Sequence, residues 1–576
     1  MKPEKVSRFM SYLEYDKAQI SNEKYKKEVT SVCPECLKLI PAYIEEDADG
    51  KVRIKKKCKE HGEIIDVISQ YPDYYKWSQN FLAKGIAIDS DKCVTTTKTG
   101  CPHDCGVCDK HKTTPILTLI DITNKCNLRC PICFANAAVT GNVVEPTFDE
   151  VVKTMKYLRS LKPYSNVAVS FSGGEPTLRK ELPDMIRKAY ELGFLQVMLI
   201  TNGIKFKDLD YCHEIKATGL QTIYLQFDGT TPETWEKTRG FNLWPIKQRI
   251  IKNLRKSGFD SVVLVPTIAK GVSDHEVGNI IQFAIDNIDL VRGVNFQPVS
   301  LCGRIPPDKL AEMRINISDL IHMIDKQTNG VLNPNVWYPV PVVAPMANLI
   351  TWYTNTPGVD FGCHPDCGFA TFMFLNDQTG ELECITDYID VPEFFKLSNK
   401  YWDEVSHQRF NKFKIITGTI DELLPLKLPS FMENLGEQLD GVHKEVYKRW
   451  VMARFFWDAL GTIKKTGRAI NSVSKILLRT KWADVASFMY DTLLISCMHF
   501  QDLYSMRTER TERCIVHYAV HDRRDQRVKL IPFCTYNSIH RPLIEEAIRV
   551  PVSKVDEGEV LTKEKALEKE AVPNIE

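Results

Sequence analysis

The sequence predicts an α/β fold built on a parallel sheet, with cysteine-rich segments before and after it. Between about residues 113 and 300, short β-branched runs alternate with amphipathic segments of helical period, the pattern of successive β/α units. Right-handed crossovers between such units give either an open doubly wound sheet or a barrel-like arc. The 18 cysteines are grouped, and without a secretory leader grouped cysteines bind metals more often than they form disulfides. The expected strands cover 115–123, 166–172, 196–201, 221–227, 261–268 and 291–297.

The segments between these strands carry helix signals. Residues 147–162 begin with Thr147 and Glu150 at the spacing of a capping box. Residues 177–193 end at Gly193, and glycine commonly terminates helices. Since ligands of parallel sheets gather at the carboxyl ends of the strands, residues that follow a strand directly are candidates for a functional site.

Composition narrows the function classes. The net charge of +1 argues against a general nucleic-acid binder, which normally carries a strongly basic domain. The first residues lack the apolar core of a secretory signal, and no apolar run of about eighteen residues is free of proline. We therefore expect a cytoplasmic protein without a transmembrane helix. Residues 546–576 are charged and poor in apolar side chains, so we expect a flexible tail there.

Three cysteines directly follow the first expected strand, in the stretch CNLRCPICF. Cys126, Cys130 and Cys133 have Cys-x3-Cys-x2-Cys spacing, and thiolates are the usual ligands of iron–sulfur clusters. A [4Fe–4S] cluster held by three thiolates keeps one iron open for a small molecule, as catalytic metal sites generally require. The alternative is a cluster that a distant cysteine completes.

A glycine-rich turn, SFSGGEPTL, closes the second expected strand. Gly173 and Gly174 allow the backbone to approach a ligand closely, and Glu175 offers an acceptor suited to an ammonium group. Together with the three cysteines, this turn resembles the radical S-adenosylmethionine (SAM) superfamily.

The resemblance implies a partial (β/α)6 barrel whose three cysteines carry a [4Fe–4S] cluster. The amino and carboxylate groups of SAM would fill the open iron position, and an electron from the cluster would split SAM into methionine and a 5′-deoxyadenosyl radical. Residues after the third and fourth strands are weaker candidates for SAM contacts, with ordinary turn residues as the alternative. The candidate SAM-binding residues are Gly173, Gly174, Glu175, Asn202, Gln226 and Asp228.

The N-terminal cysteines predict a metal ribbon. Cys33, Cys36, Cys58 and His61 form paired knuckles that suit one tetrahedral ion, and the residues between them are predicted to form a hairpin around Asp49-Gly50. Zinc is the expected metal because of the histidine, whereas a rubredoxin-like iron would prefer a fourth thiolate.

Further cysteines predict auxiliary clusters. Cys101, Cys105 and Cys108 repeat the Cys-x3-Cys-x2-Cys spacing, but no strand precedes them, so we expect an auxiliary [4Fe–4S] cluster. Its fourth ligand would be Cys93, a cysteine elsewhere in the chain, or His111. The C-terminal region adds seven candidate metal ligands that suffice for one further cluster and leave a second open: Cys302, Cys363, Cys367, Cys384, Cys497, Cys514 and Cys534.

For three cysteines a role without a metal is considered. Cys302 and Cys384 would be buried, unligated thiols if they belong to no cluster, and Cys212 is expected to be an inert core thiol.

Four regions are predicted: 1–112 with the ribbon and an auxiliary cluster, 113–300 as the barrel, 301–545 with auxiliary clusters and the substrate pocket, and the tail 546–576.

An uncharged stretch bears on the substrate. Residues 327–359 carry several aromatic side chains and prolines, so they would wall an apolar cavity, rest on a membrane surface, or simply connect elements over the barrel. Residues 447–465 and 482–500 are strongly apolar helical candidates.

The layout of the cysteine motifs over about residues 30–540 resembles the archaeal tetraether lipid synthases. This resemblance implies coupling of terminal methyl carbons of two archaeal diether phospholipids, with a low-potential electron donor and peripheral contact with a membrane. The competing hypotheses are a radical SAM methylase acting on a dihydropterin and, more remotely, a non-catalytic iron–sulfur electron carrier.

Overall fold

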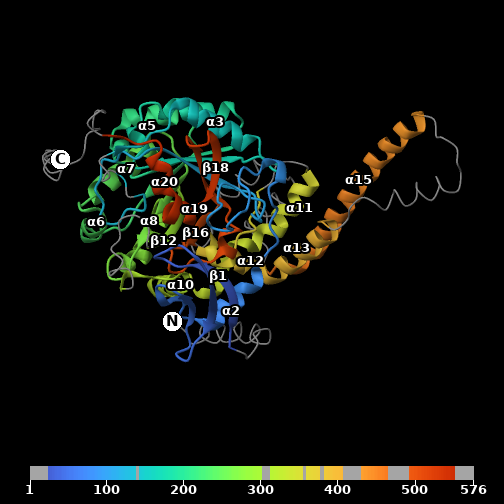
Figure 1. The fold of residues 1–576 in the computed structure, drawn as a ribbon, viewed down its shortest axis with the longest axis horizontal. Coiled ribbons are helices and arrows are strands. Elements are labelled where there is room, and N and C mark those ends of the chain that lie inside the picture. The colour runs from blue at the N-terminus through green and yellow to red at the C-terminus, as the bar shows by residue number, and fades with distance from the viewer. Residues whose placement is uncertain are drawn as a thin grey trace.

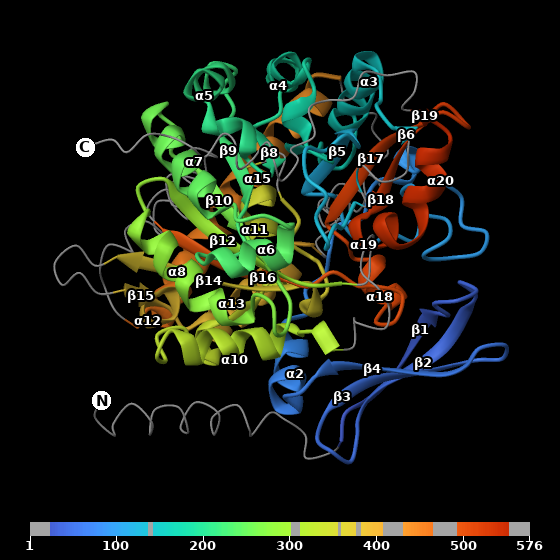
Figure 2. The same cartoon turned by 90° about the vertical axis from the view of Figure 1, so that its left-hand side faces the viewer.

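The computed structural model describes residues 24–135, 137, 142–300, 312–354, 359–375, 382–406, 430–464 and 492–551, except for the side chains of 375, 430–444 and 550–551. A large mixed sheet forms the body, and a small antiparallel sheet lies beside it at the N-terminal end of the chain (Figures 1 and 2).

The six expected strands form the centre of the large sheet. They lie next to one another in sequence order, and each pairs with its neighbour in parallel. The sequence prediction of strand positions is therefore confirmed, although β11 (Thr267–Ile268) separates from the fifth strand and pairs with the sixth. The strands are β5 (Leu117–Thr123), β7 (Ala168–Gly173), β8 (Gln196–Thr201), β9 (Thr222–Gln226), β10 (Val262–Val265) and β12 (Val291–Pro298).

The helices between these strands all cover one face of the sheet. Leu225 and Leu264 are buried among helix side chains, whereas their neighbours Tyr224 and Val263 point to the other face and remain partly exposed. Helices on a single face favour the barrel-like arc over a doubly wound sheet, and we call the other face the open face. The helices are α3 (Phe148–Arg159), α4 (Leu182–Glu191), α5 (Leu209–Lys216), α6 (Pro232–Arg239), α7 (Trp244–Lys256) and α8 (Val277–Asp286), and α10 (Ile317–Gln327) follows the last of the six strands.

The predicted helix boundaries agree with the local geometry. Thr147 Oγ1 accepts from the Glu150 backbone N–H at 3.2 Å, and the Glu150 side chain accepts from the Thr147 N–H at 2.8 Å, which is the expected capping box. Gly193 follows α4 with a φ of +83°, in the left-handed region that glycine adopts most readily.

C-terminal strands extend both edges of the sheet. One of them, β16, lies within 482–500, so the helical prediction for that stretch is wrong over β16. Leu493, Ile495 and Cys497 alternate into the core, and their backbone pairs with β12 on one side and β14 on the other. The added strands are β16 (Leu493–Met498), β14 (Gly368–Leu375), β13 (Tyr338–Pro339) and β15 (Leu382–Cys384) at one edge, and β17 (Val516–Asp522) and β18 (Arg527–Pro532) at the other.

The N-terminal module is a four-stranded antiparallel sheet with the predicted hairpin. Gly50 has a φ of +70°, and the side chain of Arg53 pairs with Asp49 across the turn at 3.0 Å. Its elements are β1 (Lys26–Val32), β2 (Leu39–Glu46), β3 (Val52–Cys58), β4 (Gly62–Ser69) and the following helix α2 (Pro72–Ser78).

Part of the uncharged stretch packs inside the structure, whereas Val331 and Val343 are exposed. Trp337 is fully buried and its indole N–H donates to the Leu332 carbonyl at 3.3 Å, while Trp352 and Tyr353 are partly buried against a cluster shared with the last part of α15. Of the three interpretations, a packed connector fits these residues; 355–358 lie outside the described residues. The helices here are α11 (Ala344–Thr354), α12 (Ile385–Tyr388), α13 (Val391–Ser406) and α15 (Ser430–Ala459).

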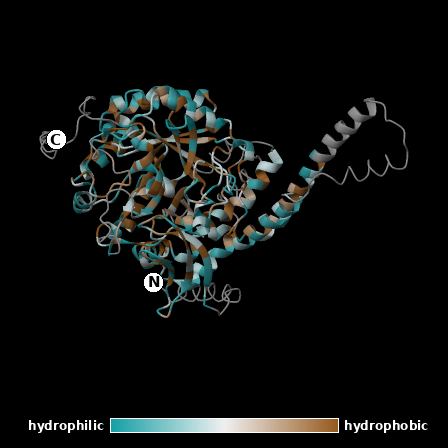
Figure 3. Cartoon of the chain, in the orientation of Figure 1, coloured by the Kyte–Doolittle hydropathy of each residue, from teal (hydrophilic) through white to brown (hydrophobic). Residues whose placement is uncertain are grey.

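Short elements complete the fold: β6 (Asn142–Val143), α18 (Thr508–Thr511), α19 (Phe533–Thr535), α20 (Arg541–Glu546) and β19 (Val550–Pro551). β19 pairs with β6, and residues 552–576 of the predicted tail lie outside the described residues. Apolar residues gather inside the body, with polar residues on the outer faces of the helices (Figure 3). Within the described part of the chain, no helix combines the length and apolarity needed to cross a membrane.

Candidate functional site

The cysteine loop lies at the carboxyl end of β5, as expected. The Leu128 backbone N–H donates to Cys126 Sγ at 3.4 Å, and the guanidinium of Arg239 hydrogen-bonds the thiol of Cys130. Burial, followed by the nearby Glu175 carboxylate, raises the pKa of Cys126 to about 12. Donors aimed at these sulfurs suit residues that become thiolate ligands of a cluster.

The two glycines of the turn approach protein backbone. A Cβ on Gly173 would lie 2.0 Å from the Thr123 carbonyl oxygen, and one on Gly174 would lie 2.2 Å from that of Lys125. The N–H groups of Gly174 and Glu175 donate to the carbonyls of Thr123 and Lys125, both at 2.7 Å. The glycine turn therefore holds the start of the cysteine loop, a role that its sequence pattern did not reveal.

Glu175 is completely buried, and its carboxylate accepts hydrogen bonds from two threonines and a backbone N–H. Its Oε1 accepts from the backbone and hydroxyl of Thr177 and from the Thr201 hydroxyl, and its Oε2 accepts from the Asn202 N–H at 2.7 Å. Burial raises the pKa of the carboxyl despite these donors. Oε1 accepts three hydrogen bonds and Oε2 accepts one; because each carboxylate oxygen offers about two acceptor positions, Oε2 retains room for one further donor such as a ligand ammonium.

Asn202 and Gln226 lie at the ends of β8 and β9, near the cysteine loop. The Asn202 side chain donates to Asn127 Oδ1 at 2.8 Å, so it links the third strand end to the cysteine motif. Gln226 is partly exposed and donates to Asp228 Oδ2 at 2.7 Å. Lys247, from the first turn of α7, is fully buried and donates to the carbonyl oxygens of Asn202 and Gln226 at 2.6 and 2.5 Å.

Asp228 is held in a buried ion pair. It is fully buried, and its two oxygens accept from Arg239 Nε at 2.5 Å and Nη2 at 2.9 Å. Burial would raise the pKa of this carboxyl, but the Arg239 guanidinium outweighs burial and lowers it. Asp228 was predicted as a SAM contact. In the structure it binds Arg239, whose guanidinium hydrogen-bonds the thiol of Cys130.

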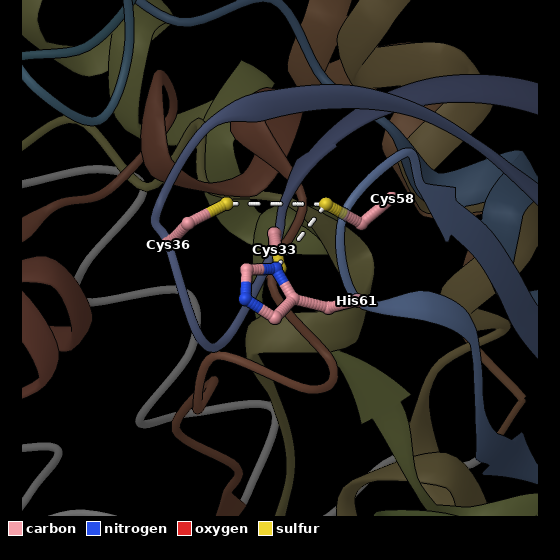
Figure 4. Close-up of side chains that lie close together, drawn as sticks. All are labelled: Cys33, Cys36, Cys58 and His61. Atoms are coloured by element: carbon pink, nitrogen blue, oxygen red, sulfur yellow. Dashed lines mark hydrogen bonds between the residues drawn. The ribbon is translucent and has the colours of Figure 1, made fainter.

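The ribbon brings its four predicted ligands together (Figure 4). Cys33 Sγ and Cys58 Sγ each lie 3.5 Å from His61 Nδ1, and Cys36 Sγ lies 3.9 Å from Cys58 Sγ. Four ligand atoms at this spacing surround a single tetrahedral ion. Within the described chain, this is the one set of three or more such ligand atoms that all lie within 4.8 Å of one another. Cluster thiolates bind separate iron corners and so stand further apart.

The second cysteine motif lies against α19 and α20. Cys101 and Cys105 hydrogen-bond each other, and this bond lowers the pKa of Cys105 to about 5. Cys93 lies within electrostatic range of Cys108, because the Val94 N–H pairs with the Val107 carbonyl at 3.1 Å. His111 Nε2 is instead 2.9 Å from the Cys514 carbonyl. The fourth ligand of this set stays a prediction.

Four of the C-terminal cysteines gather and two do not. The thiol of Cys514 is within electrostatic range of those of Cys363, Cys367 and Cys534. In contrast, strand alternation directs Cys384 and Cys497 into the hydrophobic core, where burial raises both pKa values. For Cys384 these surroundings fit the alternative of a buried, unligated thiol, whereas the metal role of Cys497 stays a prediction; Cys302 lies outside the described residues. Cys212 lies in the core, as predicted, and its thiol donates to backbone carbonyls.

Sequence reasoning missed Arg239, Lys247 and Asn127. Arg239 and Lys247 come from helices more than one hundred residues after the cysteine loop, and cations near helix ends are too common to single out. Asn127 lies between Cys126 and Cys130, so its place in the motif could have identified it as a residue of the site.

Comparisons with known proteins agree with this geometry. Residues 120–284 match the model of the radical SAM superfamily, and residues 25–70 match the HMPTM N-terminal zinc ribbon domain. A relative from Methanocaldococcus jannaschii, 7,8-dihydro-6-hydroxymethylpterin dimethyltransferase, is 43% identical over 92% of this chain and 97% of its own length. GTP 3′,8-cyclase from Peptoclostridium acidaminophilum is 26% identical over 40% of this chain and 71% of its own.

Among solved structures, SuiB from Streptococcus suis bound to S-adenosylmethionine has a TM-score of 0.30 and 15% identity, over 38% of this chain and 48% of that one. A similarity this low supports no functional argument. The M. jannaschii relative contradicts the prediction of lipid coupling, because it matches nearly the whole chain and is named for methylating a pterin. The tetraether assignment and the diether lipid substrate are therefore withdrawn.

Proposed function

Since this chain belongs to the radical SAM superfamily, we propose that it is a methylase acting on a dihydropterin-type substrate. The observation that carries the proposal is the 43% identity to a pterin dimethyltransferase over 97% of that protein. Both the ribbon and the radical SAM region are included in a match of that length, so the two proteins share their domain organisation.

The superfamily uses SAM and a [4Fe–4S] cluster and needs an electron donor. Cys126, Cys130 and Cys133 would hold the cluster, and the free acceptor position of Glu175 would receive the SAM ammonium. When bound, the cluster and SAM together would supply a carbon radical that removes hydrogen from the substrate. The methyl group would come from a second molecule of SAM, which leaves as S-adenosylhomocysteine once the electron donor supplies a second electron. The protein's part is to hold the cysteine loop, orient SAM and keep the substrate on the open face of the sheet.

Residues on the open face suit a flat polar heterocycle. Asp121 Oδ1 accepts from the Ser172 hydroxyl at 2.5 Å, and Oδ2 accepts from Arg541 at 2.7 Å, beside a cavity that reaches Gly173. Tyr518 and Tyr536 stack at 4.3 Å between ring centroids, with Arg541 over both rings. The amino and ring N–H groups of a pterin present donors to a carboxylate, and its planar ring stacks on aromatic side chains.

We also propose two auxiliary [4Fe–4S] clusters. One would use Cys93 with the three cysteines of the second motif, and the other would use the four gathered C-terminal cysteines. Three clusters and one ribbon ion correspond to about twelve irons and one zinc per chain. Eight irons or fewer in fully reconstituted protein would contradict the second auxiliary cluster.

The function is tested by product mass. Anaerobically reduced, reconstituted protein is incubated with SAM and 7,8-dihydro-6-hydroxymethylpterin, and a parallel sample receives an archaeal diether lipid. We expect a pterin product heavier by one or two methyl groups, which Asp121→Asn should reduce more than it reduces SAM cleavage. Unchanged pterin together with a coupled lipid would overturn the proposal.

A further inference from the structure

A buried cation lies directly behind the cysteine loop. Arg239, the last residue of α6, has only 8% of its surface exposed. Its guanidinium makes a two-point contact with Asp228, and Nη2 also donates to Thr267 Oγ1 at 3.2 Å. The Thr267 N–H in turn donates to Asp228 Oδ1 at 3.0 Å. These contacts fix the plane of the guanidinium, since a planar fork held at three points cannot rotate freely.

The remaining edge of the guanidinium faces the cysteine loop. Nη1 lies 3.4 Å from the Ile132 carbonyl, and the group hydrogen-bonds the thiol of Cys130. Arg239 therefore joins the ends of the fourth and fifth strands to the middle of the loop. A second buried side chain, Lys247, donates to the carbonyls of Asn202 and Gln226 nearby.

The charges around the loop support a role toward the cluster. Asp228 already neutralises Arg239, so the free protein does not need a further anion at Cys130. A cluster held by thiolates adds negative charge at the site, and one more electron adds another unit. A charge-assisted donor on a cluster sulfur stabilises the reduced form, because the interaction strengthens as the sulfur becomes more negative.

We propose that Arg239 is a positioning residue that sets the reduction potential of the SAM-binding cluster through its hydrogen bond to Cys130, with Asp228 holding it in place. The inference rests on the cluster ligands assigned above and not on the identity of the substrate. Failure of the pterin assay would therefore leave it standing.

The test is a redox titration without substrate. The reduced clusters are detected by electron paramagnetic resonance. The signal that is present in the wild type and absent from Cys130→Ala is assigned to the SAM-binding cluster. Arg239→Gln should lower the ratio of reduced to oxidised cluster at a fixed potential about tenfold, which for one electron corresponds to about 59 mV. The matched control is Arg255→Gln on α7, whose ion pair with Asp289 is exposed and remote from the loop, and which should leave the ratio unchanged.

A second variant keeps the test decisive if Arg239→Gln fails to take up iron. Arg239→Lys retains the charge but cannot bind Asp228 at two points and Cys130 together, so we expect full iron content and an intermediate fall of about threefold in the ratio. Wild-type ratios in an iron-replete Arg239→Gln or Arg239→Lys protein would overturn the proposal. They would leave Arg239 with a purely structural role.

Discussion

The glycine turn offers a sharp prediction, because Gly174 has no room for a side chain. In Gly174→Ala the new Cβ would lie 2.2 Å from the Lys125 carbonyl oxygen and 2.6 Å from that of Asn124. Ordinary contact begins at 3.4 Å, so the backbone before Cys126 must retreat by about 1.2 Å, the difference between 3.4 and 2.2 Å. That shift would also strain the two 2.7 Å hydrogen bonds that join the turn to the loop.

The cost follows from these contacts. Overpacking of a close contact costs about 1–3 kcal/mol, and each weakened backbone hydrogen bond adds about 0.5–1.5 kcal/mol. A displacement of about 1 Å in a catalytic arrangement lowers rates by about 100-fold. We therefore expect Gly174→Ala to lose about four irons per chain, or to retain them with SAM cleavage reduced at least 100-fold.

The assay is iron and acid-labile sulfide per chain, followed by 5′-deoxyadenosine release. Gly461→Ala is the matched control, because a Cβ there meets nothing within 4 Å. If Gly174→Ala keeps all its iron and cleaves SAM within twofold of wild type, then the turn does not hold the cysteine loop.

Three further changes test other parts of the structure. Burial lowers the pKa of Lys247 from 10.5 to about 7, so between these pH values the unfolded chain binds more protons than the folded chain. The free energy of unfolding therefore rises with pH by up to about 1.4 kcal/mol per pH unit. Lys247→Met should flatten the rise of the melting temperature from pH 7.5 to 9.5, and an unchanged slope would contradict the assignment. Cys36→Ser should remove the ribbon ion and expose residues 25–70 to protease without loss of iron, whereas retained zinc would show that the ion lies elsewhere. Thr147→Ala should lower the free energy of unfolding by about 1 kcal/mol in urea titrations, and no change would mean that the capping box is not formed in solution.

Local patterns account for the correct part of the fold prediction. The six central strands are short β-branched runs, and the capping box at Thr147 and Glu150 depends on residues three apart. The stretch 482–500 was misjudged because β16 is a strand only through its pairing with β12 and β14, which lie far away in the sequence.

The sequence predicted the ribbon ligands, whereas the contacts that hold the cysteine loop in place could not be predicted. Cysteine spacing identified the cysteine loop and the ribbon, and the structure brings the ribbon ligands together. Spacing could not show that Gly173 and Gly174 approach Thr123 and Lys125, or that Asp228 is fully buried against Arg239. These contacts depend on the three-dimensional packing of loops from different β/α units.

The sequence alone also could not show which of the auxiliary cysteines lie near one another. Cys497 and Cys514 lie in neighbouring motifs, yet strand alternation sends Cys497 into the core while Cys514 joins Cys363, Cys367 and Cys534. Cys363 and Cys367 precede β14 at one edge of the sheet and Cys514 precedes β17 at the other, so the proximity of these thiols depends on the whole fold.

Release of 5′-deoxyadenosine from SAM tests most directly whether three thiolates leave an iron open to the cofactor. Reduced wild-type protein should form 5′-deoxyadenosine and methionine, while Cys130→Ala should form neither and should keep the iron of its auxiliary clusters. SAM cleavage by Cys130→Ala at the wild-type rate, or none by iron-replete wild type, would contradict the account.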